Sequence, residues 1–389
     1  MIRAARHRIH MMREFSVPLL CGVAAALVWS NLSPDSYHHF NHAARIGSLS
    51  FHFLTNDIFM VLFFGIAVAE ITQSCLPGGD LHPLRTAINP LLATCGGVVG
   101  PILVYLSLNA LFGTTDLQRG WGIPTATDIA LAWLVARIVF GDRHPAIPFL
   151  LLLAIADDAV GLAIIALFYP DPALPVQPAW LAMTAAGMLT AYLLRRTGVR
   201  NYWPYLLAGG ALSWAGLFKA HLHPALALTF IVPFLPHPRR ETMHIFEEDV
   251  RDRSPLARFE HEWKIMVDFG LFMFGLANAG VRFTSIGPAT WLVLAALIIG
   301  KTGGIFCMGW LGRACGYPLP HKVGKRELLL VGIIAGIGLT VALFVAGEAF
   351  ADPLTQGAAK MGALLSAGCA CAAIVGGRAM KIRRIGARG

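Results

Sequence analysis

The chain has 389 residues, of which 56% are hydrophobic and only 14% are charged, and its formal net charge is +9. About 25% of the residues of a soluble protein are charged, so this composition excludes an ordinary soluble domain. Apolar runs of about 17 to 25 residues recur from end to end, and each is long enough to cross a bilayer as a helix. A β-barrel would instead show alternating segments of about ten residues. The composition therefore indicates an all-α polytopic membrane protein.

We predict a single transmembrane domain over 1–389, with an N-terminal tail 1–15 and a C-terminal tail 378–389. In chain order, the twelve predicted spans are 16–32, 58–76, 87–113, 121–140, 147–168, 178–194, 203–217, 221–236, 265–281, 289–312, 327–349 and 356–377. The first span follows a basic segment, as in a signal peptide, but the eleven later spans favour an uncleaved anchor.

The basic charge follows this topology. Most of the 31 lysine and arginine residues fall on the side that holds both termini. The exceptions are Arg45, Arg119, Lys219, Arg282, Lys360 and the intramembrane Lys301. Because basic residues accumulate on the cytoplasmic side, both termini are predicted to be cytoplasmic, and no nucleic-acid partner is expected. The seven cysteines show no metal-ligand spacing, and we expect no cofactor.

Two connecting segments have readable patterns. In 43–53, Gly47 and Ser48 separate short alternating runs, which predicts a small periplasmic β-hairpin, with an irregular loop as the alternative. The polar segment 237–264 mixes both signs of charge. It is either a hinge between helix groups or a solvated loop.

Spans 121–140 and 327–349 carry unusual interruptions. The first contains Pro124, Thr127 and Asp128, which remove or compete for backbone hydrogen bonds. The second contains Gly332, Gly336, Gly338 and Thr340, where glycine lets the backbone open. Each is the middle span of three, and such paired interruptions indicate a transporter site at an inverted-repeat interface. The alternative is ordinary helices that pack closely at their glycines.

Four ionisable residues lie deep inside predicted spans, namely Asp128, Asp157, Asp158 and Lys301. A charged residue at the centre of a span costs about 2.5–3.5 kcal/mol on insertion scales, which indicates a function, with a structural ion-pair network as the alternative. Adjacent helix positions differ by about 100°, so Asp157 and Asp158 point in different directions. One can meet Lys301 while the other faces an aqueous cavity. Carboxylate, hydroxyl and backbone carbonyl oxygens are suitable ligands for hard cations such as Na⁺ and Li⁺. If a proton and a cation compete for one carboxylate, binding of one releases the other, which is the basis of antiport.

Interrupted helices that face each other also need compensating charge. Facing N-termini favour a negative group and facing C-termini a positive one. We expect Asp128 to supply the first and Lys301 the second.

The stretches "GIPTATDIALAWLV", "AIADDAVGLAIIALFY", "LFMFGLANAGV", "LIIGKTGG" and "VGIIAGIGLTVALF" follow one another in this chain. Together they resemble the NhaA-type sodium/proton antiporter family over nearly the whole length. The resemblance implies twelve helices in the bacterial inner membrane, with spans 121–140 and 327–349 unwound where they cross. It also implies electrogenic exchange of protons for Na⁺ or Li⁺, and a homodimer with the segment near 43–53 at its interface.

The resemblance also implies roles for individual residues. Asp158 is the principal ion ligand and proton carrier, Asp157 pairs with Lys301 or shares the ion, and Thr127 lies near the site. A pH response is implied for four residues, Glu70, Glu260, His261 and His223, with solvated helix ends as the alternative. The family pattern is broken nearby at Gln73, Ser74 and Lys264, which leaves the pH response open while the ion site matches.

Two alternative functions would require other features. A sodium- or proton-coupled symporter of an organic solute would need a larger polar cavity. An intramembrane aspartyl protease would bring aspartates from two helices together to share a proton, whereas here they are neighbours on one helix, so no enzyme is expected.

Overall fold

The computed structural model describes residues 17–43, 45–46, 49–76, 84–170, 175–237, 254–382 and 384–385. The predicted tail 1–15 and most of the segment 237–264 lie outside the described residues. By its contacts the chain divides into two compact units, 1–40 with 84–161 and 272–389, and 41–83 with 162–271. Both units combine segments that are far apart in the sequence. The single domain over 1–389 stays a prediction.

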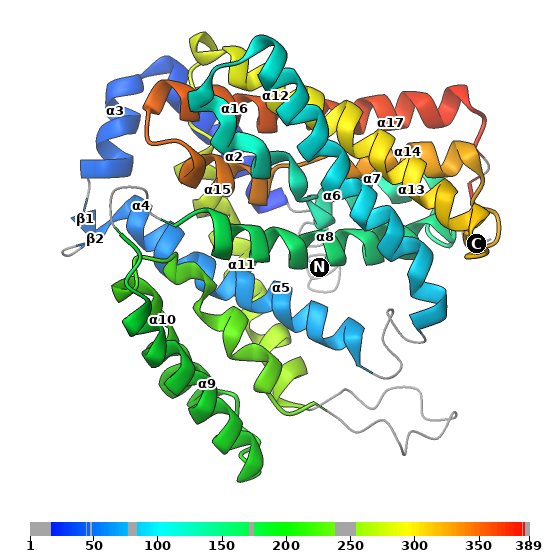
Figure 1. Ribbon diagram of the computed structural model, residues 1–389. Helices are drawn as coiled ribbons and strands as arrows, with labels where there is room; N and C mark the ends of the chain where they lie inside the picture. The colour runs from blue at the N-terminus through cyan, green and yellow to red at the C-terminus, as the bar shows by residue number, and fades with distance from the viewer. Residues whose placement is uncertain are drawn as a thin grey trace, which may run out of the picture. The chain divides into compact units, whose positions relative to one another are not determined.

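The first unit is built from helices in its described part (Figure 1). They are α2 (Val17–Leu32), α3 (Pro34–His38), α6 (Leu84–Phe112), α7 (Ile129–Phe140), most of α8 (Ala146–Phe168), the end of α11 (Pro255–Asn278), α12 (Pro288–Ala295), α13 (Thr302–Ala314), α14 (Lys325–Ala335), α15 (Thr340–Ala349), α16 (Pro353–Leu365) and α17 (Gly368–Ala379). A 3-10 segment, Thr115–Thr125, precedes α7, and a π-helical segment, Ala296–Lys301, joins α12 to α13.

The second unit holds two strands and four α-helices beside its share of α8 and α11 in its described part. They are β1 (Arg45–Ile46), β2 (Leu49–Ser50), α4 (Phe51–Phe53), α5 (Met60–Cys75), α9 (Leu181–Arg196) and α10 (Ala211–Lys219). The two strands pair antiparallel, with Arg45 opposite Ser50, so the strand pairing predicted within 43–53 is confirmed, whereas its periplasmic location stays a prediction. Its turn, Gly47 and Ser48, lies outside the described residues. Helices α9 and α10 pack side by side (Figure 1).

In the described residues, five helices are long and apolar enough to cross a membrane, and up to seven if each bent helix pair forms one span. A predominantly helical protein with several helices of membrane-spanning length is therefore confirmed, and the count of twelve stays a prediction. The segment predicted as span 221–236 differs, because it forms two 3-10 segments, Pro224–Phe230 and Val232–Phe234. Pro224 and Pro233 lack the N–H groups that a continuous α-helix requires.

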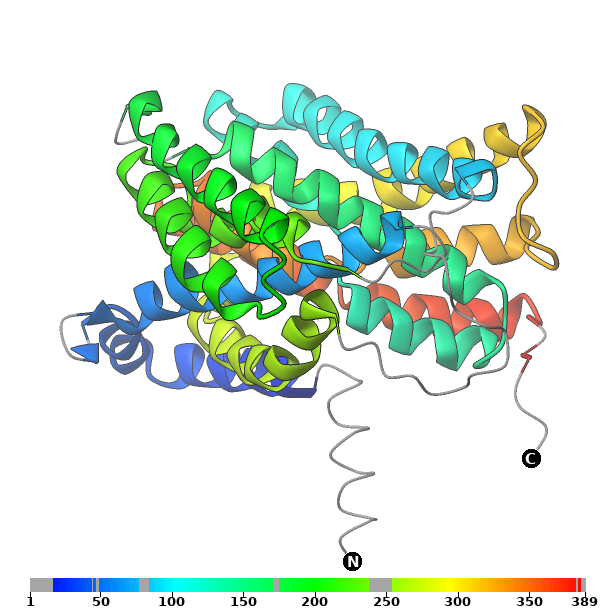
Figure 2. The same cartoon turned by 90° about the horizontal axis from the view of Figure 1, so that it is seen from below.

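Close packing of α6 against α13 and the π-helical segment before it organises the first unit (Figures 1 and 2). Gly96 and Gly100 of α6 face Gly304 and Gly300. A Cβ on Gly304 would lie 1.9 Å from the carbonyl oxygen of Gly96, and one on Gly100 would lie 2.3 Å from that of Gly300. Small residues let the two backbones meet, as is typical of helix pairs in membranes.

This crossing gives a prediction with a neighbouring control. Gly304→Ala should lower the free energy of unfolding by about 1–3 kcal/mol, since the new methyl group overlaps backbone that cannot rotate away. Gly303→Ala adds its methyl group where no atom lies within 4 Å. Because alanine favours a helix over glycine by about 0.5–1 kcal/mol, that change should be neutral or stabilising. Thermal unfolding of the purified variants measures both changes in stability. Equal effects at the two positions would contradict the close backbone contact between α6 and α13.

Candidate ion-binding site

Two helix pairs in the first unit are broken and bent. The 3-10 segment Thr115–Thr125 and α7 meet at 56°, and α14 and α15 meet at 49°. In the first break, Ala126 and Asp128 have extended backbone. The second break runs from Gly336 to Leu339. These breaks fall within the two spans whose sequences carry the unusual interruptions.

The two breaks are bonded to each other. The amide of Asp128 donates to the carbonyl of Ile337 at 2.8 Å. The hydroxyl of Thr127 lies 3.0 Å from the carbonyl oxygen of Ala335, the last residue of α14. Backbone N–H and C=O groups that lose their helical hydrogen bonds inside an apolar unit need new hydrogen-bond partners. Here residues of one break provide partners for backbone groups of the other.

Asp128 lies at the N-termini of two helices. As the N-cap of α7, its Oδ1 accepts from the amide of Leu131 at 3.1 Å. Its Oδ2 accepts from the hydroxyl of Thr340, the first residue of α15, at 2.7 Å. A negative group is favoured where the positive ends of helix dipoles converge. The role of Asp128 as a compensating carboxylate stays a prediction.

Asp157 and Lys301 form a fully buried ion pair. Lys301 Nζ lies 3.0 Å from Asp157 Oδ2, and both side chains are 0% exposed. The same ammonium donates to the carbonyl of Thr125 at 2.6 Å, at the C-terminal end of the first half-helix. Lys301 therefore places its positive charge where a helix dipole is negative.

Thr127 extends this network. Its hydroxyl lies 2.9 Å from Asp157 Oδ2, and it donates either to that atom or to the carbonyl of Ala335. Asp157 Oδ1 is buried and accepts no hydrogen bond from the described residues. A buried carboxylate oxygen that keeps lone pairs open can accept a proton or a hard cation.

Asp158 follows Asp157 on α8 and is 8% exposed, whereas Asp157 is 0% exposed. The helix turns by about 100° between them, so the two carboxylates leave α8 in different directions. One turn further, a Cβ on Gly161 would lie 3.6 Å from Ala126 and 3.9 Å from Val341, so α8 runs against both broken pairs. The structure thus brings Thr127, Asp128, Asp157 and Lys301 together with Thr340.

The glycines of the second break are positions of close approach. A Cβ on Gly336 would lie 2.9 Å from the carbonyl oxygen of Leu297, and one on Gly338 would lie 3.3 Å from that of Ala126. Gly336 and Gly338 lie in the break between α14 and α15. Thr340 does not, because it begins α15 and uses its hydroxyl on Asp128.

Sequence reasoning missed Ser366, which is fully buried between α16 and α17. Its hydroxyl lies 3.1 Å from both the amide nitrogen and the carbonyl oxygen of Gly338, and 2.6 Å from the carbonyl of Ala363. The signal was a lone hydroxyl in an apolar run. Sequence reasoning also missed the π-helical segment that ends at Lys301, a feature frequent at functional sites.

Ser366→Ala should lower the free energy of unfolding by about 1–3 kcal/mol, because the amide of Gly338 loses its hydrogen-bond acceptor while buried. Thermal unfolding measures this loss. Thr190→Ala is the control, since that hydroxyl bonds only its own helix, at the carbonyl of Ala186, on an exposed face. A loss no larger than the control's would show that Ser366 does not hold the break.

The residues considered for a pH response belong to the second unit. Glu70 on α5 interacts electrostatically with Glu260 and Lys264 on α11. Gln73, a departure from the family pattern, donates to Glu260 at 2.8 Å. His261 is exposed on α11.

His223 lies elsewhere in the second unit. It caps the 3-10 segment Pro224–Phe230, with its Nδ1 3.3 Å from the amide of Ala225. Its role in a pH response stays a prediction.

Among the described residues, no group of three or more His, Cys, Asp or Glu side chains is arranged to hold a metal ion. The site instead combines carboxylate, hydroxyl and backbone oxygens. Such a donor set suits a hard monovalent cation or a proton more than a transition metal.

Comparison with known proteins assigns the family. The family model of Na⁺/H⁺ antiporter 1 matches residues 7–379. The chain is 73% identical to Na(+)/H(+) antiporter NhaA 1 of Pelobacter propionicus and 69% identical to Na(+)/H(+) antiporter NhaA of Geobacter sulfurreducens, each over 98% of this chain and 100% of the relative.

A solved structure of the sodium proton antiporter MjNhaP1 from Methanocaldococcus jannaschii is 12% identical, with a TM-score of 0.48 over 94% of this chain and 89% of that one. This likeness is too distant to bear on function. The family match and the two full-length relatives are sufficient, and the chain belongs to the Na⁺/H⁺ antiporter 1 family, of the NhaA type.

Proposed function

We propose that this protein is a secondary active transporter that exchanges Na⁺ or Li⁺ for H⁺ across the bacterial inner membrane by alternating access. The observation that carries the proposal is the pair of diverging carboxylates, Asp157 and Asp158, beside two broken helices whose breaks bond each other. The relatives with 73% and 69% identity are named as Na⁺/H⁺ antiporters, which also supports it.

In this proposal Asp158 alternates between binding a cation and binding a proton. Entry of a cation displaces the proton, and protonation from the other side releases the cation, because one carboxylate holds only one of them at a time. Asp157 and the hydroxyl of Thr127 contribute further oxygen ligands. Exchange is electrogenic when more protons than cations move in each cycle.

Asp128 and Lys301 have a compensating role here. Their charges offset the half-helix dipoles, so the broken helices remain stable inside the membrane while the site opens to either side. The half-helices would rock or shift against the rest of the protein to expose Asp158 alternately.

The finer architecture belongs to the same proposal. It comprises twelve transmembrane helices in two inverted repeats, cytoplasmic termini, no cofactor, and a homodimer in the lipid bilayer that uses the hairpin β1–β2. The support for cytoplasmic termini is the distribution of lysine and arginine.

The symporter of an organic solute is not supported, because the full-length relatives are named as antiporters. The diverging aspartates on α8 also lack the shared-proton geometry of an aspartyl protease.

Everted membrane vesicles from cells without their own sodium/proton antiporters test the exchange. After respiration has acidified the vesicle interior, addition of Na⁺ or Li⁺ should release protons, and a ΔpH-sensitive dye reports this. K⁺ and choline serve as cation controls. If neither Na⁺ nor Li⁺ collapses the pH gradient at any pH between about 6 and 9, the proposed function is wrong.

A further inference from the structure

In the C-terminal segment after α17, the described residue Ile385 is bonded to the end of α7. The amide of Ile385 donates to the carbonyl of Phe140 at 2.9 Å, and the amide of Arg143 donates to the carbonyl of Ile385 at 3.0 Å. Gly141 has φ +84°, and a Cβ there would lie 2.8 Å from the oxygen of Ile385, so only glycine fits. The segment is therefore held by backbone hydrogen bonds.

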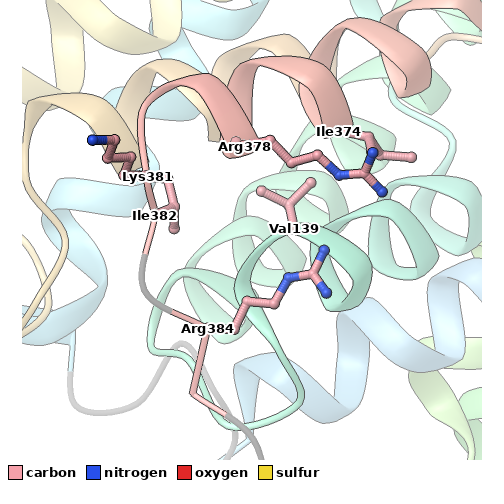
Figure 3. A pocket seen from close by; sticks show the side chains of 7 residues that line it. Val139, Ile374, Arg378, Lys381, Ile382 and Arg384 are labelled. Carbon is pink, nitrogen blue, oxygen red and sulfur yellow. The ribbon is translucent and has the colours of Figure 1, made fainter.

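A cavity of about 280 Å³ lies between this segment, α7 and α17. Val139, Ile374 and Ile382 give it an apolar lining, and Arg378 and Arg384 line it with guanidinium groups. Figure 3 shows these two arginine side chains on either side of Val139, whereas the ammonium group of Lys381 points away. The cavity combines an apolar floor with two cations.

The charges of Arg378 and Arg384 are not neutralised within the described part of the chain, where neither has a carboxylate within ion-pair distance. Asp142, at the same end of α7, is held by Arg137 at 2.5 Å. Guanidinium groups that line a pocket without a carboxylate favour an anionic ligand, and their planar forks match phosphate.

The position of the cavity along the predicted spans favours the phosphate of a lipid headgroup. The apolar helix Pro353–Ala379 ends at Ala379, and the bent span that contains α7 ends at Phe140. Arg378 and Val139, each one residue before such an end, line the cavity. The cavity is therefore expected where a span meets the headgroup layer, on the side predicted to be cytoplasmic. Basic pockets between transmembrane helices at that level bind anionic lipid headgroups.

We propose that this cavity binds the phosphate group of an anionic phospholipid. Arg378 and Arg384 contact the phosphate oxygens, while Val139 and Ile374 pack against the glycerol and the first acyl carbons. The volume is close to the lower end of small-molecule pockets, about 300 Å³, which suits a headgroup and excludes a whole lipid. The bound lipid joins α17 and the C-terminal segment to α7, and the site is independent of the cation exchange.

The test uses the purified, delipidated full-length protein in detergent. Thermal unfolding is followed while dioleoyl phosphatidylglycerol, dioleoyl phosphatidylcholine or Tris phosphate is added, and native mass spectrometry counts bound lipid. Phosphatidylglycerol should raise the unfolding temperature by about 4 °C or more, and phosphatidylcholine by much less.

Arg378→Gln with Arg384→Gln should weaken phosphatidylglycerol binding by about tenfold or more, because two charge-assisted contacts are lost. Arg196→Gln with Arg200→Gln is the matched control, since it removes two exposed cations elsewhere on the same predicted side. The single change Arg384→Gln, on an exposed residue, covers the case in which the double variant does not fold, and it should still weaken binding severalfold.

Four outcomes would overturn the proposal. Equal stabilisation by phosphatidylcholine would show that the anionic headgroup is not recognised. Equal stabilisation by Tris phosphate would identify free phosphate as the ligand. Unchanged phosphatidylglycerol affinity in the arginine variants, or an equal loss in the control, would place the lipid elsewhere.

Discussion

Asp158→Asn is expected to lower Na⁺-driven proton release by at least about a hundredfold while the protein still folds. Asparagine keeps the size of the side chain and one carbonyl oxygen, but it neither titrates nor carries the negative charge that attracts a hard cation. Cation binding and proton binding therefore lose their shared carboxylate at the same time. The vesicle assay at saturating Na⁺ and Li⁺ measures the loss.

The matched control is Asp142→Asn, which neutralises an exposed carboxylate at the end of α7 that pairs with Arg137. We expect exchange near the wild-type rate, because surface ion pairs contribute about 0–1 kcal/mol. Equal amounts of both variants in the membrane make the comparison valid. Full exchange by Asp158→Asn would show that the carrier carboxylate is another residue.

Lys301→Met is expected to destabilise the protein by about 3–5 kcal/mol, the usual result of breaking a buried ion pair from one side. Methionine fills a similar volume, so the loss comes from charge. Asp157 keeps the hydroxyl of Thr127 as a donor but loses the ammonium at 3.0 Å, and the carbonyl of Thr125 loses its donor at 2.6 Å.

The double variant Lys301→Met with Asp157→Asn shows whether the loss of stability comes from an unpaired buried charge or from altered side-chain packing. Removal of both charges leaves no buried ion, so most of the lost stability should return relative to Lys301→Met alone. Thermal unfolding in detergent of the wild type, both single variants and the double variant gives the coupling energy. Additive losses would show that Asp157 and Lys301 do not stabilise each other.

The same pair explains how an apolar helix such as α8 carries two adjacent aspartates. One is neutralised by Lys301, and the ammonium is at the same time placed at the C-terminal end of a half-helix. Asp128, by contrast, places its negative charge at the N-termini of two helices, α7 and α15. Asp128, Asp157 and Lys301 therefore each face a charge or a helix dipole of opposite sign, which lowers the cost of burying them.

The sequence by itself determined the membrane class, because run length and hydrophobicity are local quantities that a bilayer selects directly. It also determined that Asp157 and Asp158 diverge, since a helix turns by a constant angle per residue. The interruption near Asp128 was visible for a similar reason, because proline, threonine and aspartate act on the backbone beside them. The match of five ordered motifs indicated the family.

Only the tertiary structure decided which aspartate contacts Lys301, that Thr127 reaches both Asp157 and Ala335, and that Ser366 bonds Gly338. It also decided that Thr340 begins a helix and that Gly96 meets Gly304. These contacts join segments far apart in the chain. They depend on how the helices pack against one another. Helix periodicity and local propensity describe one segment at a time, so they do not show which face of a distant helix packs against it.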